Sequence, residues 1–450
     1  MNERLRHEKI SKLLFSLALP SVLAQLTTLI YNMVDRIYIG RLADGALAIA
    51  GVGLCASIIT IMTAFTNLFG RGGSPLASIK LGENKIDESE KILGNCFMSL
   101  LIISIIMMIV LNLFGSEILM LFGASENTLP YAMSYLRIYS LGTIFAQLSV
   151  GLNYFINTQG FAKYGMTTLL IGGILNIILD PIFIFILDMG VAGAALATIL
   201  SQLVSCIWVL KFLFGPKTTI RIKKANMRLD SKIMKRVLEL GFSPFFMGST
   251  EGILQVSFNR QLLFFGGDIA VSSMTILMSL SQILFLPMEG IAQGAQPIIS
   301  FNYGAKAYDR VLKTISLTLK SALVFSIIGV SLMEIFPNLF VNLFASDSQL
   351  IELSCQMLRV YVFGFMFFGA FSTFQQTYTS LGFGKRSFFF AFYRKIILLI
   401  PLIYILPFFI SDGVFAVVLA EPISDILSTI TNAVFFKKFI KKELPLNSKE

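Results

Sequence analysis

Histidine and cysteine are scarce in this chain of 450 residues, and charged residues make up only 14% of it. The single histidine, His7, lies among basic residues before the first apolar run, so we do not expect a catalytic site that uses histidine. The four cysteines, Cys55, Cys96, Cys206 and Cys355, stand far apart and form no CxxC spacing. They predict neither a disulfide framework nor a zinc site, and we expect no cofactor.

Apolar residues, in contrast, make up 55% of the chain and arrive in runs of about twenty. A helix that rises 1.5 Å per residue needs about twenty residues to cross ~30 Å of hydrocarbon. We therefore predict an all-α polytopic membrane protein with twelve transmembrane helices. Their predicted positions are 13–38, 46–69, 92–114, 131–157, 164–187, 191–214, 237–264, 271–297, 314–336, 355–380, 388–410 and 414–436.

Lysine and arginine gather in alternate connections between these runs. The connection at 215–236 carries eight of them against one acid, Asp230. Basic residues also follow the second, fourth, eighth, tenth and twelfth runs. The positive-inside rule places these segments in the cytoplasm, so both termini are predicted to be cytoplasmic in a bacterial-type plasma membrane. These loops explain the net charge of +10, and no nucleic-acid partner is expected.

The two halves of the chain resemble each other weakly. Pro20 recurs as Pro244, and Gly82 recurs as Gly304. Because each half has six helices, both copies begin on the same side of the membrane, as parallel repeats related by a pseudo-two-fold axis along the membrane normal. We predict an N-lobe at 1–214, a basic inter-lobe loop at 215–236, and a C-lobe with a basic tail at 237–450.

Asp180 is the strongest candidate for a functional residue, since an ionisable side chain inside a span costs roughly 2.5 to 3.5 kcal/mol. Asn176 lies one turn earlier on the same helix face. The turn near 188–190 should bring Thr198 of the next helix to a similar depth. We expect the carboxylate, the amide and the hydroxyl to meet. The alternative is that Asp180 caps a helix interrupted by Pro181.

Asp35 lies near the outer end of the first predicted helix, in the same half of the membrane as Asp180, with Tyr31 on its face. Two buried carboxylates in one cavity would take up protons or be neutralised by Na⁺, and either event is a coupling step. The alternative is an interfacial aspartate beside Arg36. Pro20 bends this helix either as a moving part or as a static kink.

Glu251 is an acidic residue inside a predicted C-lobe span. Asn259 stands where Asp35 would recur, and no acid stands where Asp180 would. Glu251 is therefore interpreted either as a structural hydrogen-bonding group or as a second contact for an ion or a drug. Because the second half does not copy the acidic set of the first, the expected function is concentrated in the N-lobe. The charged residues assigned to the spans are mainly acidic.

Several segments together resemble the multidrug and toxic compound extrusion (MATE) transporters over nearly the whole chain, including the arrangement of six plus six helices. They are 35–42, 176–182, 190–202 and 289–306. The resemblance implies these roles: a first-lobe cation site at Asp35, Asn176, Asp180 and Thr198, a bending proline at Pro20, and cavity-lining side chains at Tyr31 and Asn153.

The resemblance is incomplete in the second lobe. Glu251 matches an acidic residue of a second-lobe cation site known in one branch of the family. The partner positions in this chain are Phe368 and Ser372, where that branch has tyrosine and aspartate. A second-lobe Na⁺ site is therefore in doubt.

The resemblance implies an antiporter that exports cationic or amphipathic organic compounds, including drugs, by alternating access. Na⁺ or H⁺ is the expected coupling ion, the bilayer the expected surrounding, and a monomer the expected state. The alternative is a lipid-linked oligosaccharide flippase of the related superfamily, which needs extra helices or a basic central cavity. An enzyme is not expected: Asp35 and Asp180 could imitate an aspartyl dyad, but no supporting signature of an intramembrane hydrolase accompanies them.

Overall fold

The computed structural model describes residues 2–42, 44–345 and 347–445. Residue 1 and residues 446–450, at the two ends that we predict to be cytoplasmic, lie outside the described residues. Ten helices in the described part are long and apolar enough to cross a membrane. One of them, α9 (Ser231–Gly304), is two spans, because Gly267 interrupts it with φ 65° and ψ −162°. The pair α5 (Leu129–Leu141) and α6 (Thr143–Thr158) adds another span. The predicted twelve spans are thus confirmed.

The other spans follow the predicted order along the chain. They are α2 (Ile10–Gly40), α3 (Gly45–Gly82), α4 (Ile86–Leu121), α7 (Ala162–Pro181) with the π-helix η1 (Ile182–Ile186), α8 (Gly190–Phe214), α10 (Tyr308–Ile335), α12 (Ser348–Phe363) with α13 (Phe365–Ser380), α14 (Gly384–Phe392) with η3 (Tyr393–Leu399), α15 (Ile400–Ile405) and η4 (Leu406–Phe408), and α16 (Gly413–Glu443). Short helices α1 (Asn2–His7), η2 (Lys224–Asn226) and α11 (Pro337–Val341) lie between or before them.

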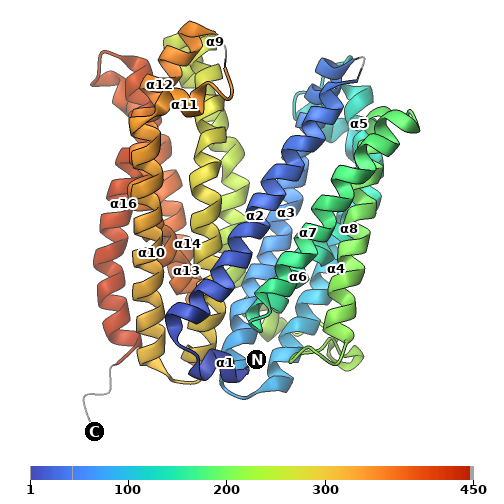
Figure 1. The fold of residues 1–450 in the computed structure, drawn as a ribbon, viewed down its shortest axis with the longest axis vertical. Coiled ribbons are helices and arrows are strands. Elements are labelled where there is room, and N and C mark those ends of the chain that lie inside the picture. Colours follow the sequence, from blue (N-terminus) through green and yellow to red (C-terminus); the bar gives the residue numbers. More distant parts are fainter. Residues whose placement is uncertain (1, 43, 346, 446–450) are drawn as a thin grey trace.

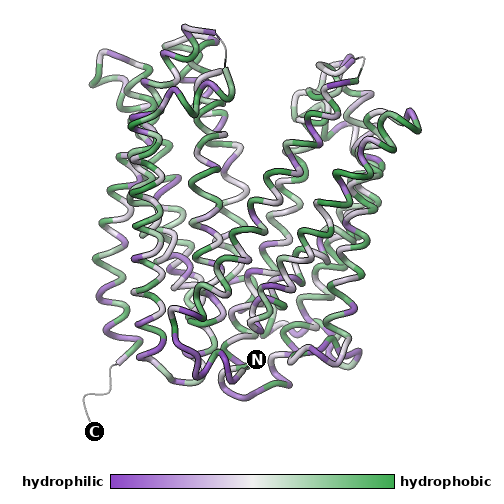
Figure 2. The backbone as a smooth tube through the Cα atoms, in the orientation of Figure 1, coloured by the Kyte–Doolittle hydropathy of each residue, from purple (hydrophilic) through white to green (hydrophobic). Residues whose placement is uncertain are grey.

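The helices form two groups, α2 to α8 and α9 to α16, which are the predicted lobes (Figure 1). The groups lie together at the end where α2 begins and α16 ends, which we call the basal end (Figure 1). They diverge toward the opposite, distal end. Hydrophobic residues dominate along the helices, and hydrophilic segments gather in the connections at the basal end (Figure 2). The apolar runs therefore form the lateral surface that lipid would cover.

A symmetric pair of glycine contacts joins the lobes near the basal end. A Cβ atom added to Gly82 would lie 2.0 Å from the carbonyl oxygen of Phe301. A Cβ added to Gly304 would lie 2.0 Å from the carbonyl oxygen of Ile79. The two contacts are equivalent under an internal repeat of 222 residues. In this repeat Gly82 corresponds to Gly304, and Ile79 corresponds to Phe301. The pseudo-two-fold axis thus passes between α3 and the second half of α9.

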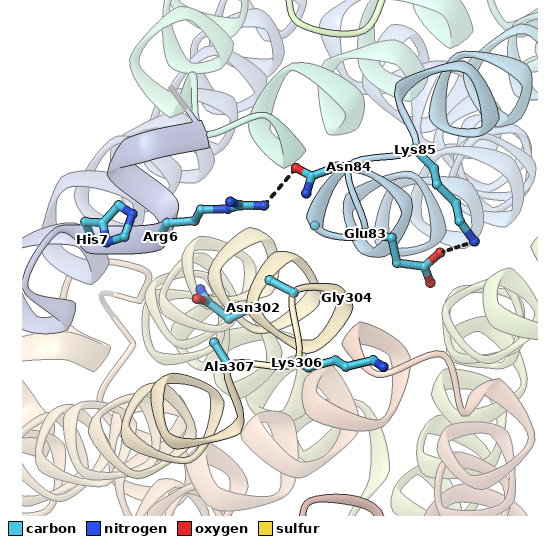
Figure 3. Close-up of a pocket in the computed structure, with 11 residues that line it drawn as sticks. Arg6, His7, Glu83, Asn84, Lys85, Asn302, Gly304, Lys306 and Ala307 are labelled. Carbon is cyan, nitrogen blue, oxygen red and sulfur yellow. Dashed lines mark hydrogen bonds and ion pairs between the residues drawn. The ribbon is translucent and has the colours of Figure 1, made fainter.

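The basal end is also closed by α1. A pocket of about 650 Å³ lies there between two repeat-related loops (Figure 3), in which Asn84 and Lys306 have matching φ values of 63° and 59°. Arg6 donates a hydrogen bond to Oδ1 of Asn84 at 2.7 Å (Figure 3). Arg310 of α10 donates to the carbonyl of Leu5 at 3.1 Å. Helix α1 therefore contacts both lobes.

The basic connection between the lobes is folded against the N-lobe. Oε1 of Gln159 accepts hydrogen bonds from the hydroxyl of Thr218 and from the backbone N–H groups of Thr219 and Ile220, at 2.9, 2.7 and 3.0 Å. Gln159 and Ile220 are fully buried. Helix α9 then begins at Ser231, inside the predicted loop range, because Asp230 caps its first turn. The connection is thus an ordered strap beneath the N-lobe.

Replacing Gln159 with leucine is expected to destabilise the protein by roughly 2 kcal/mol or more, because buried N–H groups of the strap would lose their acceptor. The expected result is a lower midpoint of thermal unfolding for the detergent-purified protein. Gln349→Leu is the matched control, since Gln349 is exposed. Equal midpoints for the two variants would contradict the role of Gln159.

Candidate functional site

A polar centre lies inside the N-lobe, between α7 and α8. The side-chain amide of Asn176 donates hydrogen bonds to Oδ1 of Asp180 at 3.1 Å and to the hydroxyl oxygen of Thr198 at 3.3 Å. The Thr198 hydroxyl donates in turn to the carbonyl of Ala194. Asp180 is fully buried, and Asn176 is 2% exposed. The carboxylate, amide and hydroxyl therefore meet as their spacing in the sequence suggested.

The end of α7 positions this carboxylate. Pro181 is the last residue of α7, and the π-helix η1 follows it directly. Proline cannot donate a backbone hydrogen bond, and π-helical turns commonly occur at functional sites. Oδ1 of Asp180 accepts its hydrogen bond from Asn176 and Oδ2 has no partner, so neither oxygen caps the turn that follows. Asp180 thus faces Asn176 instead of capping the helix that follows.

Three oxygen atoms around this centre are buried and have no hydrogen-bond partner: Oδ2 of Asp180, Oδ1 of Asn176 and Oδ1 of Asp35. The charge of Asp35 acts on Asp180, so the two carboxylates are near neighbours in the fold. Buried polar atoms without partners are rare and need an explanation. Oxygen atoms of this kind bind hard cations, and a carboxylate also binds a proton. The donor set therefore fits either Na⁺ or H⁺.

Tyrosine side chains adjoin the polar centre, and two of them were not predicted. The rings of Tyr135 and Tyr139 on α5 stack with centroids 5.7 Å apart. Tyr135 interacts with Thr198 and with the charge of Asp35, and Tyr139 interacts with Tyr31. The only signal in the sequence is the i, i+4 spacing of two tyrosines in a span. This spacing is also common in ordinary helix packing.

The structure separates two residues that the family resemblance grouped together. Tyr31 packs on α7, where a Cβ added to Gly173 would lie 3.3 Å from its ring. Asn153 instead donates a hydrogen bond to the carbonyl of Gly165 at 3.1 Å and is buried between α6 and α7. Gly165 precedes Asp180 by fifteen residues on α7, which is about 22 Å of helix. Asn153 therefore lies far from the polar centre.

Pro20 is buried where α2 contacts the C-lobe. A Cβ added to Gly294 would lie 2.4 Å from Cα of Ala18, and one added to Gly290 would lie 2.8 Å from Cα of Val22. Helix α2 runs continuously from Ile10 to Gly40 through this proline. A role for Pro20 in bending stays a prediction, and its position would let a bend change the contact between the lobes.

The C-lobe contains buried basic residues that the sequence interpretation missed. Lys395 donates a hydrogen bond to Glu251, and Arg394 forms ion pairs with Glu421 at 2.7 Å and with Asp425 at 2.5 Å. The interpretation of the charge in the spans as mainly acidic thus left out two buried cations of the C-lobe. The signal was present, since all four newly found residues stand inside predicted spans, where any ionisable side chain is notable.

An ion pair also connects the lobes near the pseudo-two-fold axis. Arg71 of α3 donates to Glu289 of α9 at 2.5 Å and to the hydroxyl of Tyr154 at 3.1 Å. Tyr154 donates to Asn67, and Gln293 donates to Glu289. Asn67 maps to Glu289 under the 222-residue repeat, and Arg71 maps to Gln293. Any rocking of the lobes must therefore change this network.

Glu289→Gln is expected to open the basal end, because breaking a largely buried ion pair costs about 3 kcal/mol or more. We expect a cysteine at Ser78, which is buried and donates a hydrogen bond to the carbonyl of Pro297 in the other lobe, to react with a water-soluble thiol reagent at least about ten-fold faster in this variant. The reversed pair Arg71→Glu with Glu289→Arg is expected to slow the labelling again. Unchanged labelling in Glu289→Gln would show that the pair does not hold the lobes together.

Comparison with known protein families gives matches in both lobes. The family described as MatE matches residues 20–182 and 251–405. A multidrug export protein, MepA, of Staphylococcus haemolyticus is 28% identical over 351 residues, covering 78% of this chain and 77% of the relative. MepA of Staphylococcus saprophyticus is 26% identical over 411 residues, covering 90% of each protein.

Solved structures agree with these matches. The structure of a MATE multidrug transporter, DinF-BH, in complex with R6G is 33% identical, covers 98% of both chains and has a TM-score of 0.90. An outward-facing structure of a multidrug resistance MATE family transporter has a TM-score of 0.92 at 20% identity, again over 98% of both chains. The second likeness concerns the fold alone. It agrees with the two-lobe arrangement seen here.

Proposed function

Because the chain belongs to the MatE family, we propose that it exports cationic or amphipathic organic compounds in exchange for H⁺ or Na⁺. At the coarser level it is a multi-pass membrane protein and a multidrug efflux transporter of the MATE type. The observation that carries the proposal is the buried N-lobe centre, where Asp180 and Asn176 each have an oxygen without a partner. Such oxygens suit an ion that binds and leaves.

The proposed coupling ion binds at Asp35, Asn176, Asp180 and Thr198. Two neighbouring carboxylates in an apolar interior repel each other and are stabilised when a proton or Na⁺ neutralises one of them. Binding then favours one arrangement of the lobes over the other. Two schemes fit: the ion reorganises the N-lobe through a bend at Pro20, or ion and drug compete for the carboxylates.

Tyr31, Tyr135 and Tyr139 support an organic cation as the transported compound. Aromatic faces attract cations, and the attraction grows when the cation is desolvated. The charge of Asp35 acts on Tyr31 and Tyr135, and the ring of Tyr139 stacks on that of Tyr135. A compound with a positive charge and an apolar body would find both kinds of contact there, and a transporter acting as a monomer could provide them.

The flippase alternative needs a basic cavity for a pyrophosphate. Arg71, Arg394 and Lys395 are basic residues that the structure buries wholly or in part, but each contacts a carboxylate. Their charge is thus already largely balanced. This pairing favours the antiporter over a transporter of anionic lipid-linked sugars.

We further propose that the basal end faces the cytoplasm, so that both termini are cytoplasmic. Single cysteines at Lys224 and Asp347, introduced after replacement of the four native cysteines, test this orientation in intact cells. A membrane-impermeant thiol reagent is expected to label position 347 and to leave position 224 unlabelled. Labelling at 224 from outside would overturn the orientation.

The function is tested by efflux of ethidium from proteoliposomes in which Na⁺ and H⁺ gradients are imposed separately. Efflux that follows one gradient would support the antiporter and name its ion. Efflux that depends on neither gradient would contradict the antiporter and favour the flippase alternative.

A further inference from the structure

The C-lobe has a buried charge cluster with its own architecture. Nη2 of Arg394 donates to Glu421 at 2.7 Å, and Nε donates to Asp425 at 2.5 Å. The guanidinium lies over the rings of Phe368 and Phe371, 5.1 and 5.7 Å from their centroids. The side chains of Arg394, Glu421 and Asp425 are 7%, 8% and 1% exposed. The cluster is therefore enclosed by protein.

The charges of this cluster do not balance. Arg394 carries one positive charge and faces two carboxylates, Glu421 and Asp425. The adjacent Lys395–Glu251 pair is neutral by itself. Helix α12 contributes Tyr361, which is uncharged, and the contacts from α13 are phenylalanine rings. Fully ionised, Arg394, Glu421 and Asp425 together carry one net negative charge in a space enclosed by protein, and a buried net charge is costly.

One oxygen of the cluster is available to neutralise the excess charge. Oδ2 of Asp425 is buried and has no hydrogen-bond partner. It lies beside the break between α12 and α13, where a Cβ added to Gly364 would approach it to 2.9 Å. A metal cation would need several oxygen ligands close to the positive Arg394. A proton needs only this oxygen.

We propose that the C-lobe holds one exchangeable proton on the Glu421–Asp425 pair, at a site separate from the N-lobe polar centre. The occupant is a proton, and Arg394 stabilises the carboxylate that remains ionised. The proposal rests on the proposed antiport for its role in transport, but proton binding at this pair does not depend on that role.

The Lys395–Glu251 pair connects this site with the surroundings. Lys395 is 1% exposed, whereas the Glu251 side chain is 59% exposed. The charges of both residues act on Glu421. A compound or ion that binds at Glu251 therefore changes the affinity of the buried pair for its proton. Glu251 thus becomes a regulatory contact in addition to a structural hydrogen-bond acceptor.

The site lies at a different depth from the N-lobe centre. Under the 222-residue repeat, Arg394 and Lys395 take the places of Gly172 and Gly173. Gly172 precedes Asp180 by eight residues on α7, which is about 12 Å of helix. The C-lobe proton is therefore nearer the basal end. The two lobes carry their ionisable groups at two levels instead of one.

Infrared difference spectroscopy of the purified protein between alkaline and acidic pH tests the proposal, since a protonated carboxyl has its own carbonyl band. Asp425→Asn and Glu421→Gln are each expected to remove one wild-type band that Asp180→Asn leaves in place. Arg394→Met, which removes the compensating cation, is expected to add one band. Arg394→Lys should keep the wild-type number. Monodisperse elution from size-exclusion chromatography verifies folding of each variant.

Two results would overturn the proposal. One is a set of bands identical to wild type in both Asp425→Asn and Glu421→Gln. The other is a C-lobe band that persists at every pH at which the protein is folded, since that proton would not exchange. The measurement needs no transport. A wild-type protein that shows the C-lobe band but no gradient-driven efflux would thus reject the antiport. A wild-type protein that shows gradient-driven efflux but no C-lobe band would reject the second proton site.

Discussion

Asp180→Asn is expected to reduce gradient-driven efflux to the level of protein-free vesicles, because an amide cannot bind a proton and does not supply the charge that holds Na⁺. Its fully buried carboxylate is hydrogen-bonded to Asn176 and electrostatically linked to Asp35, so the variant removes one of the two charges of the proposed ion site. The measurement is ethidium efflux from proteoliposomes under the gradient that drives the wild type.

Asp188→Asn is the matched control for that variant. Asp188 is an exposed aspartate in the turn after the same helix, and its φ of 52° is one that asparagine adopts easily. Efflux by this variant is expected to equal the wild type. If Asp180→Asn also transported at the wild-type rate, the N-lobe centre would have no part in coupling.

Gly82→Ala is expected to lower transport at least about ten-fold. This factor corresponds to destabilising the state with a closed basal end by about 1.4 kcal/mol relative to the open state. The new methyl group would lie 2.0 Å from the backbone oxygen of Phe301, so the two lobes must separate at that point. Gly304→Ala is expected to have the same effect, because the repeat makes the two contacts equivalent.

The control for this pair of variants lies on the same helix. A Cβ added to Gly53 of α3 meets nothing within 4 Å, so Gly53→Ala is expected to transport normally. Thiol labelling of a cysteine at Ser78, which is buried on α3 between the lobes, should become faster in Gly82→Ala and stay unchanged in Gly53→Ala. Equal transport by the two alanine variants would refute the tight basal contact.

Much of the fold could be predicted because the bilayer imposes a length on every apolar run, and because the repeat fixes the symmetry. The helix ends could not be predicted as well. Helix α3 continues to Gly82, well past the predicted end at residue 69, because its last turns pack on the other lobe. An apolar window measures contact with lipid, whereas backbone hydrogen bonds and packing decide where a helix stops.

The N-lobe centre could be predicted because Asn176 and Asp180 are one turn apart and a short turn brings Thr198 alongside. Arg394 and Lys395 were missed for the opposite reason. Their partners lie on other helices, and pairing with Glu421 or Glu251 is a property of the packed lobe. The average hydropathy of a run conceals single charges of this kind.

The most direct test of the antiport is the reciprocal flux. Proteoliposomes loaded with ethidium and given no ion gradient are diluted into drug-free buffer, and internal pH and internal Na⁺ are followed as the drug leaves. Because coupling between two ligands is reciprocal, the outward drug gradient is predicted to draw one of the two ions inward, and Asp180→Asn is predicted to abolish this movement. Ethidium that leaves through the wild-type protein without movement of either ion would contradict the account.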